Sequence, residues 1–469
     1  MKIFRNILLI SFTALMIIQT SNIKCQSVNY YDYQKIDIKP IELPVPDRPE
    51  GVTDVLGLAC DPIPLVRVGI IGLGMRGYMA VDRFRYIEGA EIIALCDLYP
   101  DRVEKSEKLW HEVRDNKVYG YSGKYGWREL CERNDVDLVY ICTPWDSHVE
   151  MALYAMEHGK HVALEVPAAM TVEGCWQLVD MAEKTRKHCM MLENCCYDFF
   201  ELATLNMAQN GVFGEIMHVE GAYIHDLRDL QFLPEKDGGY QGKWRINHNA
   251  VHTGNPYPTH GLGPVCQILD IHRGDKMEYL VSMSTKQRGI TEYTTERYGE
   301  NSAEAKRHYE LGDMNNTIIY TNKGKTILIQ HDITSPRPYN RLHTISGTKG
   351  FAQKYPVKQI ALEPNAHKRL NDSTMNALLE KWEHPFVSEI GNKAKEVGGH
   401  GGMDFIMDYR LIYCLNKGLP LDQDVYDAAE WSCIVELSEI SARNYSVPVA
   451  IPDFTRGAWD KLKGYKQHN

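Results

Sequence analysis

The chain has 469 residues, of which 44% are hydrophobic and 24% are charged, and its formal net charge is −10 at pH 7. This length accommodates two ordinary domains with complete hydrophobic cores, and the composition is that of a globular protein, not of a disordered or fibrous one. The acidic balance and the lack of a basic cluster in the sequence argue against a nucleic acid as partner.

The first 25 residues have the layout of a secretory signal peptide. Lys2 and Arg5 precede a largely apolar run over residues 7–18, and a polar segment follows up to Cys25. Because this run is too short to span a bilayer comfortably, we predict cleavage near Cys25, a secreted or periplasmic protein, and no membrane span after cleavage. Lipidation of Cys25 would need a small residue directly before it, but that residue is a lysine. Signal-peptide cleavage without lipidation is therefore favoured. An uncleaved anchor helix is the alternative.

Residues 26–64 contain six prolines and little periodicity, which predicts an extended lead-in and not a domain. From residue 65 the pattern alternates between strands and helices, as in a parallel sheet. Apolar runs predict strands over residues 66–71, 91–96, 137–142, 162–165 and 189–193. Apolar residues at helical spacing predict helices over residues 148–157 and 172–187.

The first predicted strand leads into a glycine pattern that is typical of dinucleotide binding. Gly72, Gly74 and Gly77 form G-x-G-x-x-G, and Asp97 ends the second strand, 20 residues after the third glycine. The first glycine makes a tight turn, the second lets the backbone approach the pyrophosphate, and the third allows close packing of helix and strand. The pyrophosphate is favoured at the N-terminus of the helix. Asp97 favours the ribose hydroxyls of NAD over the extra phosphate of NADP, while Arg76 beside the turn acts against that preference.

After residue 195 the sequence pattern changes to runs in which apolar and polar residues alternate. Such runs indicate a largely antiparallel sheet. The predicted strands cover residues 216–223, 279–285, 317–320 and 326–330, and the predicted helices cover 403–417 and 424–443. The predicted fold class is therefore α/β. A Rossmann dinucleotide-binding domain over residues 65–194 is followed by an α+β domain with a largely antiparallel open sheet and C-terminal helices over 195–469.

The densest polar stretch, residues 244–263, contains His248, His252 and His260. Three histidines suggest a zinc site, but the glycines and prolines between them indicate a loop, where two histidines would not share a helix face. We therefore predict no metal, and we interpret His248 and His252 as hydrogen-bonded loop residues. His260 and Tyr257 are better candidates for proton transfer, because histidine titrates near neutrality and a tyrosine can act when a neighbour lowers its pKa.

Several segments together resemble the glucose-fructose oxidoreductase and inositol dehydrogenase superfamily, over residues 65 to about 455. They are the glycine pattern, Cys142-Thr-Pro-Trp-Asp-Ser-His148, Glu165-Val-Pro167, and His260 ten residues before Asp270. Three segments are also similar to glycoside hydrolase family 109, the NAD-dependent α-N-acetylgalactosaminidases. These are Tyr257-Pro-Thr-His260-Gly-Leu-Gly-Pro264, Glu165-Val166 and Gly399-His-Gly-Gly-Met-Asp-Phe405.

The resemblance implies three groups of site residues. The cofactor contacts, besides the three glycines, are Met75, Arg76, Asp97, Trp145, Asp146, Ser147, His148, Glu165, Val166 and Asn194. The sugar contacts are Tyr223, Arg245, Tyr257, Pro258, Thr259, His260 and Tyr339. The catalytic candidates are His260 and Tyr257, with Tyr339 assisting. Several of these cofactor contacts follow predicted strands, at the edge where parallel sheets bind their ligands.

One position separates the two levels of resemblance. Dehydrogenases of the superfamily usually carry Glu-Lys-Pro, whose lysine helps to move the proton as an alcohol becomes a ketone. Here that position is Val166. Valine cannot transfer a proton, which argues against a net dehydrogenase and favours the glycosidase family, where this valine is expected.

The resemblance implies a hydrolase that removes terminal α-linked N-acetylgalactosamine from a small molecule or a glycan. It would oxidise C3 with bound NAD, eliminate the C1 substituent after loss of the C2 hydrogen, add water and reduce C3 again. Recycled NAD needs no supply of reductant outside the cytoplasm, and NAD-dependent glycosidases are exceptions to the two-carboxylate scheme. The alternatives are a periplasmic NAD-dependent sugar dehydrogenase, a conventional glycosidase using Asp226 and Asp229, and a sugar-binding protein without catalysis. A homo-oligomer is left open.

Overall fold

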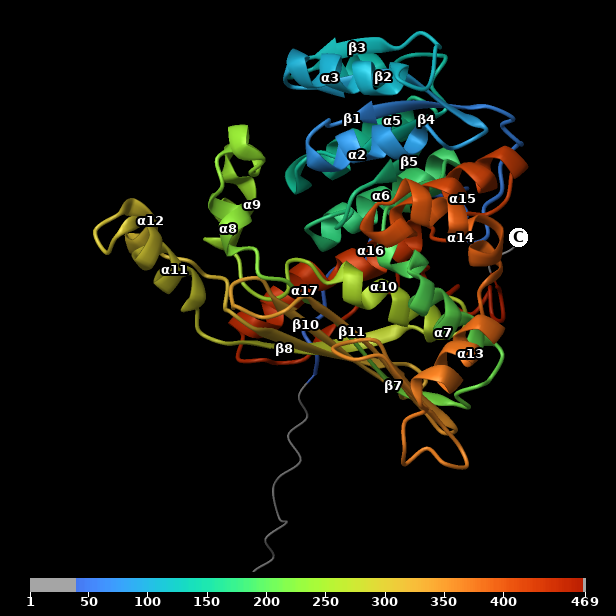
Figure 1. Ribbon diagram of the computed structural model, residues 1–469, viewed down its shortest axis with the longest axis vertical. Helices are drawn as coiled ribbons and strands as arrows, with labels where there is room; N and C mark the ends of the chain where they lie inside the picture. The colour runs from blue at the N-terminus through green and yellow to red at the C-terminus, as the bar shows by residue number, and fades with distance from the viewer. Residues whose placement is uncertain (1–38, 467–469) are drawn as a thin grey trace, which may run out of the picture. The chain divides into compact units, whose positions relative to one another are not determined.

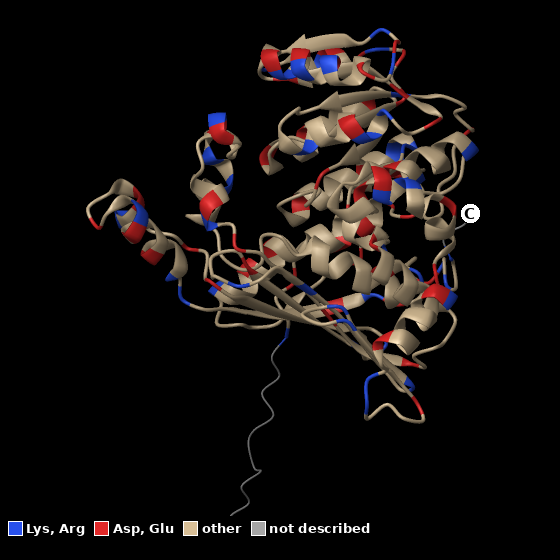
Figure 2. Ribbon diagram, in the orientation of Figure 1, with Lys and Arg blue, Asp and Glu red and all other residues tan. Residues whose placement is uncertain are grey.

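The computed structural model describes residues 39–466, so the predicted signal peptide and the first part of the lead-in lie outside the described residues. The described residues build a six-stranded sheet and an eight-stranded sheet (Figure 1). Acidic and basic residues are interspersed over both sheet regions (Figure 2). Over residues 39–466, we find no helix with the length and apolar character that crossing a membrane requires.

The first domain is a Rossmann domain whose six parallel strands have the order β3-β2-β1-β4-β5-β6. The strands are β1 (Val66–Ile71), β2 (Ala90–Asp97), β3 (Tyr119–Ser122), β4 (Leu138–Ile141), β5 (His161–Leu164) and β6 (Cys189–Met191). The helices are α2 (Met75–Phe84), α3 (Pro100–His111), α4 (Gly126–Cys131), α5 (His148–Glu157) and α6 (Val172–Thr185). Strands β4 and β5 are buried along their whole length, as expected for a parallel sheet covered on both faces. This confirms the predicted Rossmann fold.

The second domain contains a mixed sheet with the order β13-β12-β11-β7-β10-β9-β8-β14. Its strands are β7 (Ile216–Ile224), β8 (Met277–Ser284), β9 (Asn315–Thr321), β10 (Thr326–Asp332), β11 (Asn340–Gly347), β12 (Gly350–Gln353), β13 (Gln359–Leu362) and β14 (Val449–Ala450). All neighbours are antiparallel except β7 and β10, which confirms a largely antiparallel sheet. Helices cover one face, and the opposite face exposes apolar side chains such as Met283 and Ile318.

The helices of the second domain form a layer that lies between the two sheets, and two projecting segments (Figure 1). The layer contains α7 (Phe199–Gln209), α10 (Thr259–Ile268), α13 (Asp372–Lys381), α14 (Pro385–Val397), α15 (Met403–Lys417), α16 (Val425–Ser432) and α17 (Ile434–Arg443). The projecting segments carry α8 (Arg228–Phe232), α9 (Trp244–Asn249), α11 (Gly289–Tyr298) and α12 (Ala303–Lys306). The predicted helix over 403–417 is confirmed. The single helix predicted over 424–443 is wrong, because it is divided at Cys433, whose thiol donates to the carbonyl oxygen of Glu430 at 3.2 Å.

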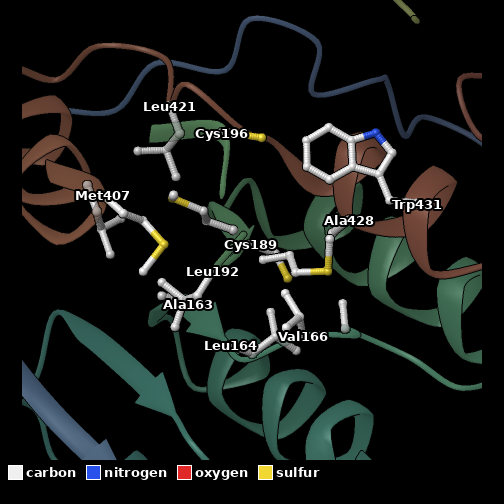
Figure 3. Close-up of a cluster of buried hydrophobic side chains, with 14 of the residues drawn as sticks. Ala163, Leu164, Val166, Cys189, Leu192, Cys196, Met407, Leu421, Ala428 and Trp431 are labelled. Atoms are coloured by element: carbon white, nitrogen blue, oxygen red, sulfur yellow. The ribbon is translucent and has the colours of Figure 1, made fainter. Parts of the chain in front are cut away.

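The two domains share one hydrophobic core. Val166 and Leu164, from the end of β5, lie in the same cluster of buried apolar side chains as Met407 of α15 and Trp431 of α16 (Figure 3). The position that a lysine occupies in the related dehydrogenases is therefore a buried apolar one here, with Val166 only 3% exposed. A charged amine would be costly at this place without a partner.

Candidate active site

The turn between β1 and α2 has the geometry that a dinucleotide requires. Gly72 has φ of +88°, and a Cβ atom on Gly77 would lie 1.8 Å from the carbonyl oxygen of Gly72. A Cβ atom on Gly74, in contrast, would find only one protein atom within 4 Å, a guanidinium nitrogen of Arg102 at 3.8 Å. Gly72 thus serves the tight turn and Gly77 the packing of helix and strand. Gly74 faces space that a pyrophosphate can fill.

Asp97 is fixed at the end of β2. Its carboxylate accepts hydrogen bonds from the backbone N–H of Leu73 at 2.7 Å and of Tyr99 at 3.0 Å. These two bonds connect the acid to the glycine turn and leave the remaining lone pairs for two ribose hydroxyls. An acceptor with these free lone pairs fits the ribose of NAD.

Arg76 does not point to the ribose edge, which corrects the opposing influence that its place in the sequence suggested. Its guanidinium donates to Glu165 at 2.8 Å and to Asp404 at 3.2 Å. Burial disfavours its charge, but these carboxylates raise the pKa of Arg76 well above its ordinary value. Arg76 therefore connects α2 to the end of β5 and to α15.

Other predicted cofactor residues also lie at the carboxyl edge of the parallel sheet. The indole N–H of Trp145 donates to the carbonyl of Val166 at 3.1 Å, and Asn194 donates to Asp404 at 2.5 Å. Both ring nitrogens of His148 lie within hydrogen-bond distance of backbone carbonyls, at 2.8 and 2.9 Å, and burial lowers its pKa. His148 thus shapes the loop after β4 through its backbone partners. Asp146 is exposed on this loop, and the Ser147 hydroxyl bonds back to Thr143 at 2.8 Å.

The predicted sugar residues form one cluster next to this edge. Ring centroids lie 4.8 Å apart for Tyr223 and Tyr257, 5.0 Å for Tyr257 and His260, and 6.5 Å for Tyr223 and Tyr339. The central guanidinium carbon of Arg245 lies 4.7 Å from the Tyr257 ring centre. Trp145 stacks on Tyr257 at 5.7 Å, so the cofactor edge and the aromatic cluster are in contact.

Two glycines bring α10, the helix that carries His260, against the sheet. A Cβ atom on Gly261 of α10 would lie 2.3 Å from the backbone nitrogen of Ala222 in β7, and one on Gly221 would lie 2.1 Å from the carbonyl oxygen of Gly261. This close approach places His260 beside Tyr223, at a ring distance of 5.4 Å. Pro258 is the N-cap residue of α10, and Thr259 is buried in its first turn.

His260 therefore lies on a helix, which corrects the prediction that residues 244–263 form one loop; His248 lies on α9 as well. The glycines and prolines that indicated a loop are concentrated between the two helices. His248 stacks on His252 at 4.3 Å, and His252 binds Glu439 at 2.9 Å.

Arg245 has unused hydrogen-bonding capacity inside the cluster. It is 4% exposed, and one terminal nitrogen donates to the hydroxyl of Tyr240 at 3.0 Å. Its Nε and second terminal nitrogen are buried without a hydrogen-bond partner among the described residues. Buried polar groups are normally paired, so these donors point to a polar ligand such as sugar hydroxyls or an acetamide.

Glu193 fixes His260 and was not predicted from the sequence. Its two carboxylate oxygens lie 2.7 and 2.9 Å from Nδ1 of His260, and it also accepts from the backbone N–H of Cys195 at 3.0 Å. Burial would raise the pKa of this carboxyl, but His260 and the hydrogen bonds hold it below its ordinary value. An anionic partner on Nδ1 leaves Nε2 of His260 to exchange a proton with a ligand.

A second histidine-carboxylate pair comes from the glycine-rich segment before α15. Nδ1 of His400 lies 2.9 Å from Asp404 and 3.5 Å from the guanidinium of Arg76, and its side chain is 51% exposed. Burial opposes the charge of Asp404, but His400, Arg76 and Arg83 hold its pKa well below the ordinary range. The segment 399–405 entered the sequence analysis only through its resemblance to a family, with no role assigned to His400.

His225 is a third histidine that the sequence analysis missed. Its Nδ1 lies 3.0 Å from the hydroxyl of Tyr223, and its ring centre lies 5.0 Å from that of Tyr339. Burial lowers its pKa, and the charges of Arg245, His260 and His400 act in the same direction. Its position directly after β7, two residues beyond Tyr223, is the signal that could have identified it.

The tyrosines of the cluster act as neutral hydrogen-bond donors. Burial raises the pKa of Tyr223 to about 12 even though Arg245 favours its ionised form, and burial raises the pKa of Tyr257 well above its ordinary range. A histidine is therefore the better candidate for proton abstraction near neutral pH. This favours His260 over Tyr257 as the base.

The acids of the conventional glycosidase alternative are engaged elsewhere. Asp226 binds Arg228 at 2.7 and 2.9 Å, and this partner lowers the pKa of the Asp226 carboxyl. Asp229 accepts from Tyr293 at 2.5 Å and from Arg297 at 2.9 Å. Each of these carboxylates is therefore already paired with an arginine.

Comparisons with known proteins agree with this geometry. Residues 197–461 match Glycosyl hydrolase 109, C-terminal domain, and residues 66–193 match the oxidoreductase family with the NAD-binding Rossmann fold. The chain is 60% identical over 409 residues to an alpha-N-acetylgalactosaminidase of Bacteroides fragilis, covering 87% of this chain and 96% of the relative. It is 53% identical over 442 residues to a glycosyl hydrolase family 109 protein of Porphyromonas gingivalis, covering 91% and 92%.

Solved structures show the same fold. An NAD binding oxidoreductase from Klebsiella pneumoniae matches with a TM-score of 0.64 and 18% identity, covering 83% of this chain and all of that one. A myo-inositol dehydrogenase from Lactobacillus casei, in complex with NAD(H) and myo-inositol, matches with a TM-score of 0.56 and 18% identity, covering 83% and 99%. Identities this low establish the architecture and not the reaction.

Proposed function

The chain belongs to glycosyl hydrolase family 109, and on that premise we propose that it is an α-N-acetylgalactosaminidase that uses a recycled NAD. The observation that carries the proposal is the pair His260 and Glu193 next to the unpartnered nitrogens of Arg245, at the edge of an NAD-binding Rossmann domain. Bound NAD would supply a reversible hydride acceptor and a histidine of the cluster would take the proton of the C3 hydroxyl, so that C3 of the sugar is a ketone during bond cleavage and an alcohol in the product.

The sugar is held by donors of the cluster, of which Arg245 and Tyr223 are buried and Tyr339 is exposed. Arg245 offers Nε and one terminal nitrogen, and Tyr223 and Tyr339 offer hydroxyls. The rings of Trp145 and Tyr257 supply an apolar wall beside the sugar, where the cluster meets the nucleotide edge. These contacts fix the ring so that C2 faces His260 and its reacting bonds are oriented.

His260 removes the hydrogen on C2 as a proton. A ketone at C3 makes this hydrogen acidic, and the electrons of the C2–H bond form a C1–C2 double bond as the bond from C1 to the leaving oxygen breaks. Glu193 stabilises the imidazolium that results. Addition of water then returns a hydroxyl to C1 and a proton to C2, so that the net reaction is hydrolysis.

His400 protonates the leaving oxygen. It is the half-exposed histidine of the site, and an aglycone must leave through the open side. Asp404 holds its Nδ1, as Glu193 holds that of His260, so both histidines present Nε2. Two separate histidines allow one to accept a proton while the other donates one.

The apolar place of Val166 disfavours a net sugar dehydrogenase. Its side chain lies in the core shared by the two domains, so the lysine that assists dehydrogenases of the superfamily has no counterpart at this position. We also propose a secreted or periplasmic location, on the basis of the predicted signal peptide. A cofactor that returns to its starting state suits such a location, because it needs no supply of reductant.

The test follows the hydrogen on C2. When an α-N-acetylgalactosaminide is hydrolysed in heavy water, we expect the N-acetylgalactosamine product to carry deuterium at C2, detected by NMR or mass spectrometry. Direct displacement at C1 never breaks the C2–H bond, so product without deuterium would refute the proposal. His260→Ala should lower turnover by about a hundredfold or more with NAD still bound. His252→Ala, which removes a neighbouring histidine outside the cluster, is the matched control.

A further inference from the structure

The segment between β7 and α10 touches the Rossmann domain at two places. We call residues 225–249 the arm; it rises from the sheet toward the parallel strands (Figure 1). Near its tip, Glu235 accepts from a terminal nitrogen of Arg102 in α3 at 2.8 Å. At its C-terminal foot, the ring of Trp244 lies 4.7 Å from that of Trp145, in the loop after β4.

These two contacts lie at opposite ends of the nucleotide edge. Strand β1 lies between β2 and β4, so an NAD molecule that follows the carboxyl edge extends from Asp97, at the end of β2, toward the loop after β4. The contact at the tip adjoins the adenosine end, and the contact at the foot adjoins the sugar cluster. The arm therefore crosses the crevice along its length.

Arg102 lies between the two signature residues of the nucleotide site. Its guanidinium is 3.7 Å from Asp97 and 3.8 Å from the position of a Cβ atom on Gly74. It also lies 4.9 Å above the ring of Tyr99, and Tyr99 and Met75 are exposed here. A cation at this place faces the pyrophosphate and the ribose of a bound dinucleotide, whereas Glu235 holds it from the side of the arm.

We infer that the ion pair of Arg102 and Glu235 is a clasp that closes the arm over the adenosine half of NAD and retains the cofactor between turnovers. The inference rests on the proposed function, because a recycled cofactor gains from slow release whereas a dehydrogenase must exchange it. Glu235 thereby acts on the nucleotide through Arg102, as a positioning residue. Since the pair is partly exposed, its effect is a change in release rate and not an absolute requirement for binding.

The experiment measures nucleotide release directly. Purified enzyme loaded with carbon-14-labelled NAD is diluted into excess unlabelled NAD, and the label retained by the protein is followed with time. We expect Glu235→Gln to release label at least fivefold faster than the unsubstituted chain. Asp237→Asn removes the same charge from an exposed position in the same turn, and it should leave the rate unchanged.

A double substitution tests whether the two residues act as a pair. Glu235→Gln should add nothing to the release rate when Arg102 is already alanine. Equal rates for Glu235→Gln and the unsubstituted chain, an equal acceleration by Asp237→Asn, or a full effect of Glu235→Gln beside Arg102→Ala would each overturn the clasp. Release is measured without any glycoside, so its outcome is independent of the C2 deuterium test. A chain that retains NAD without exchanging C2 would refute the proposed function alone.

Discussion

Glu193 and Asp404 each hold a histidine by Nδ1, at 2.7 and 2.9 Å. A third pair, His252 and Glu439, has a similar distance of 2.9 Å but lies outside the aromatic cluster. Glu439 can therefore serve as the control for Glu193, because it binds a histidine at a similar distance but outside the aromatic cluster.

We predict that Glu193→Gln lowers turnover by about a hundredfold with bound NAD retained, because glutamine keeps the shape but cannot stabilise the imidazolium form of His260. Steady-state kinetics with an aryl α-N-acetylgalactosaminide, together with the nucleotide content of the purified protein, would measure both effects. Glu193→Asp keeps the charge and should recover part of the activity, which a merely structural role would not require. Glu439→Gln should change turnover less than threefold, and near-normal turnover of Glu193→Gln would contradict the assignment.

Among the elements of the candidate site, α10 lies against its neighbouring strand through two glycines. Gly221 and Gly261 let the helix backbone lie against β7, and the distance between His260 and Tyr223 depends on that contact. Side chains larger than hydrogen at these positions would meet backbone atoms, which cannot move aside as a side chain can.

Gly261→Ala is therefore expected to push α10 away from β7. The added Cβ atom would lie 2.3 Å from a backbone nitrogen, and relief of this clash should cost about 1–3 kcal/mol of stability and most of the activity. Thermal unfolding and turnover would be measured together. Gly391→Ala in α14 is the control, because the nearest atom to its Cβ, at 2.9 Å, is a methyl carbon of Val387 that can shift. Full activity of Gly261→Ala would show that the contact does not position His260.

The elements also show why part of the fold was predictable. Strand β1 and helix α5 have the predicted bounds, because their apolar periodicity is local to a few residues. Strand β11 was not predicted, and its alternation is interrupted where Leu342 and His343 have positive φ and the register with β7 shifts. Strand β3 was not predicted either, because it lies at the sheet edge and its sequence, YGYS, contains no apolar run.

The site was predictable only where the residues lie in a motif. The glycines, Asp97 and the segment Tyr257 to His260 are contiguous or at fixed spacing. Glu193 and His260 are 67 positions apart in the two domains, and Arg76 and Asp404 are 328 apart. No periodicity connects such pairs, because the fold alone brings them together.

At the scale of the whole molecule, buried histidines control how stability depends on pH. His161 and His188 stack at 5.0 Å in the Rossmann domain, and burial lowers their pKa values to about 3 and about 4. His272 lies in the second domain, with Nδ1 2.7 Å from Glu430 and Nε2 3.4 Å from Asp424. Burial and Arg273 disfavour its charge, but the surrounding carboxylates raise its pKa to about 10.

His161 and His188 affect stability below neutral pH, whereas His272 affects it above neutral pH. His161 and His188 stay neutral when folded, so their stabilisation is present above the unfolded pKa of about 6.5 and is lost as the pH falls toward 4. The imidazolium of His272 stabilises the fold fully below the same value, and this contribution is lost as the pH rises toward 10. The free energy of unfolding should therefore be greatest near pH 6.5 to 7.

We predict that His272 is responsible for a large part of the loss of stability between about pH 7 and 7.5, a window that lies below the ordinary pKa of cysteine and tyrosine. Denaturant midpoints measured across this window should fall for the unsubstituted chain. His272→Gln should be less stable at pH 7, because Glu430 and Asp424 lose their nearest cationic partner, but its midpoint should change little with pH. His248→Gln is the matched control, since burial lowers the pKa of His248 to about 4 and its removal should leave the alkaline slope unchanged. An undiminished slope in His272→Gln would assign the alkaline loss to other groups.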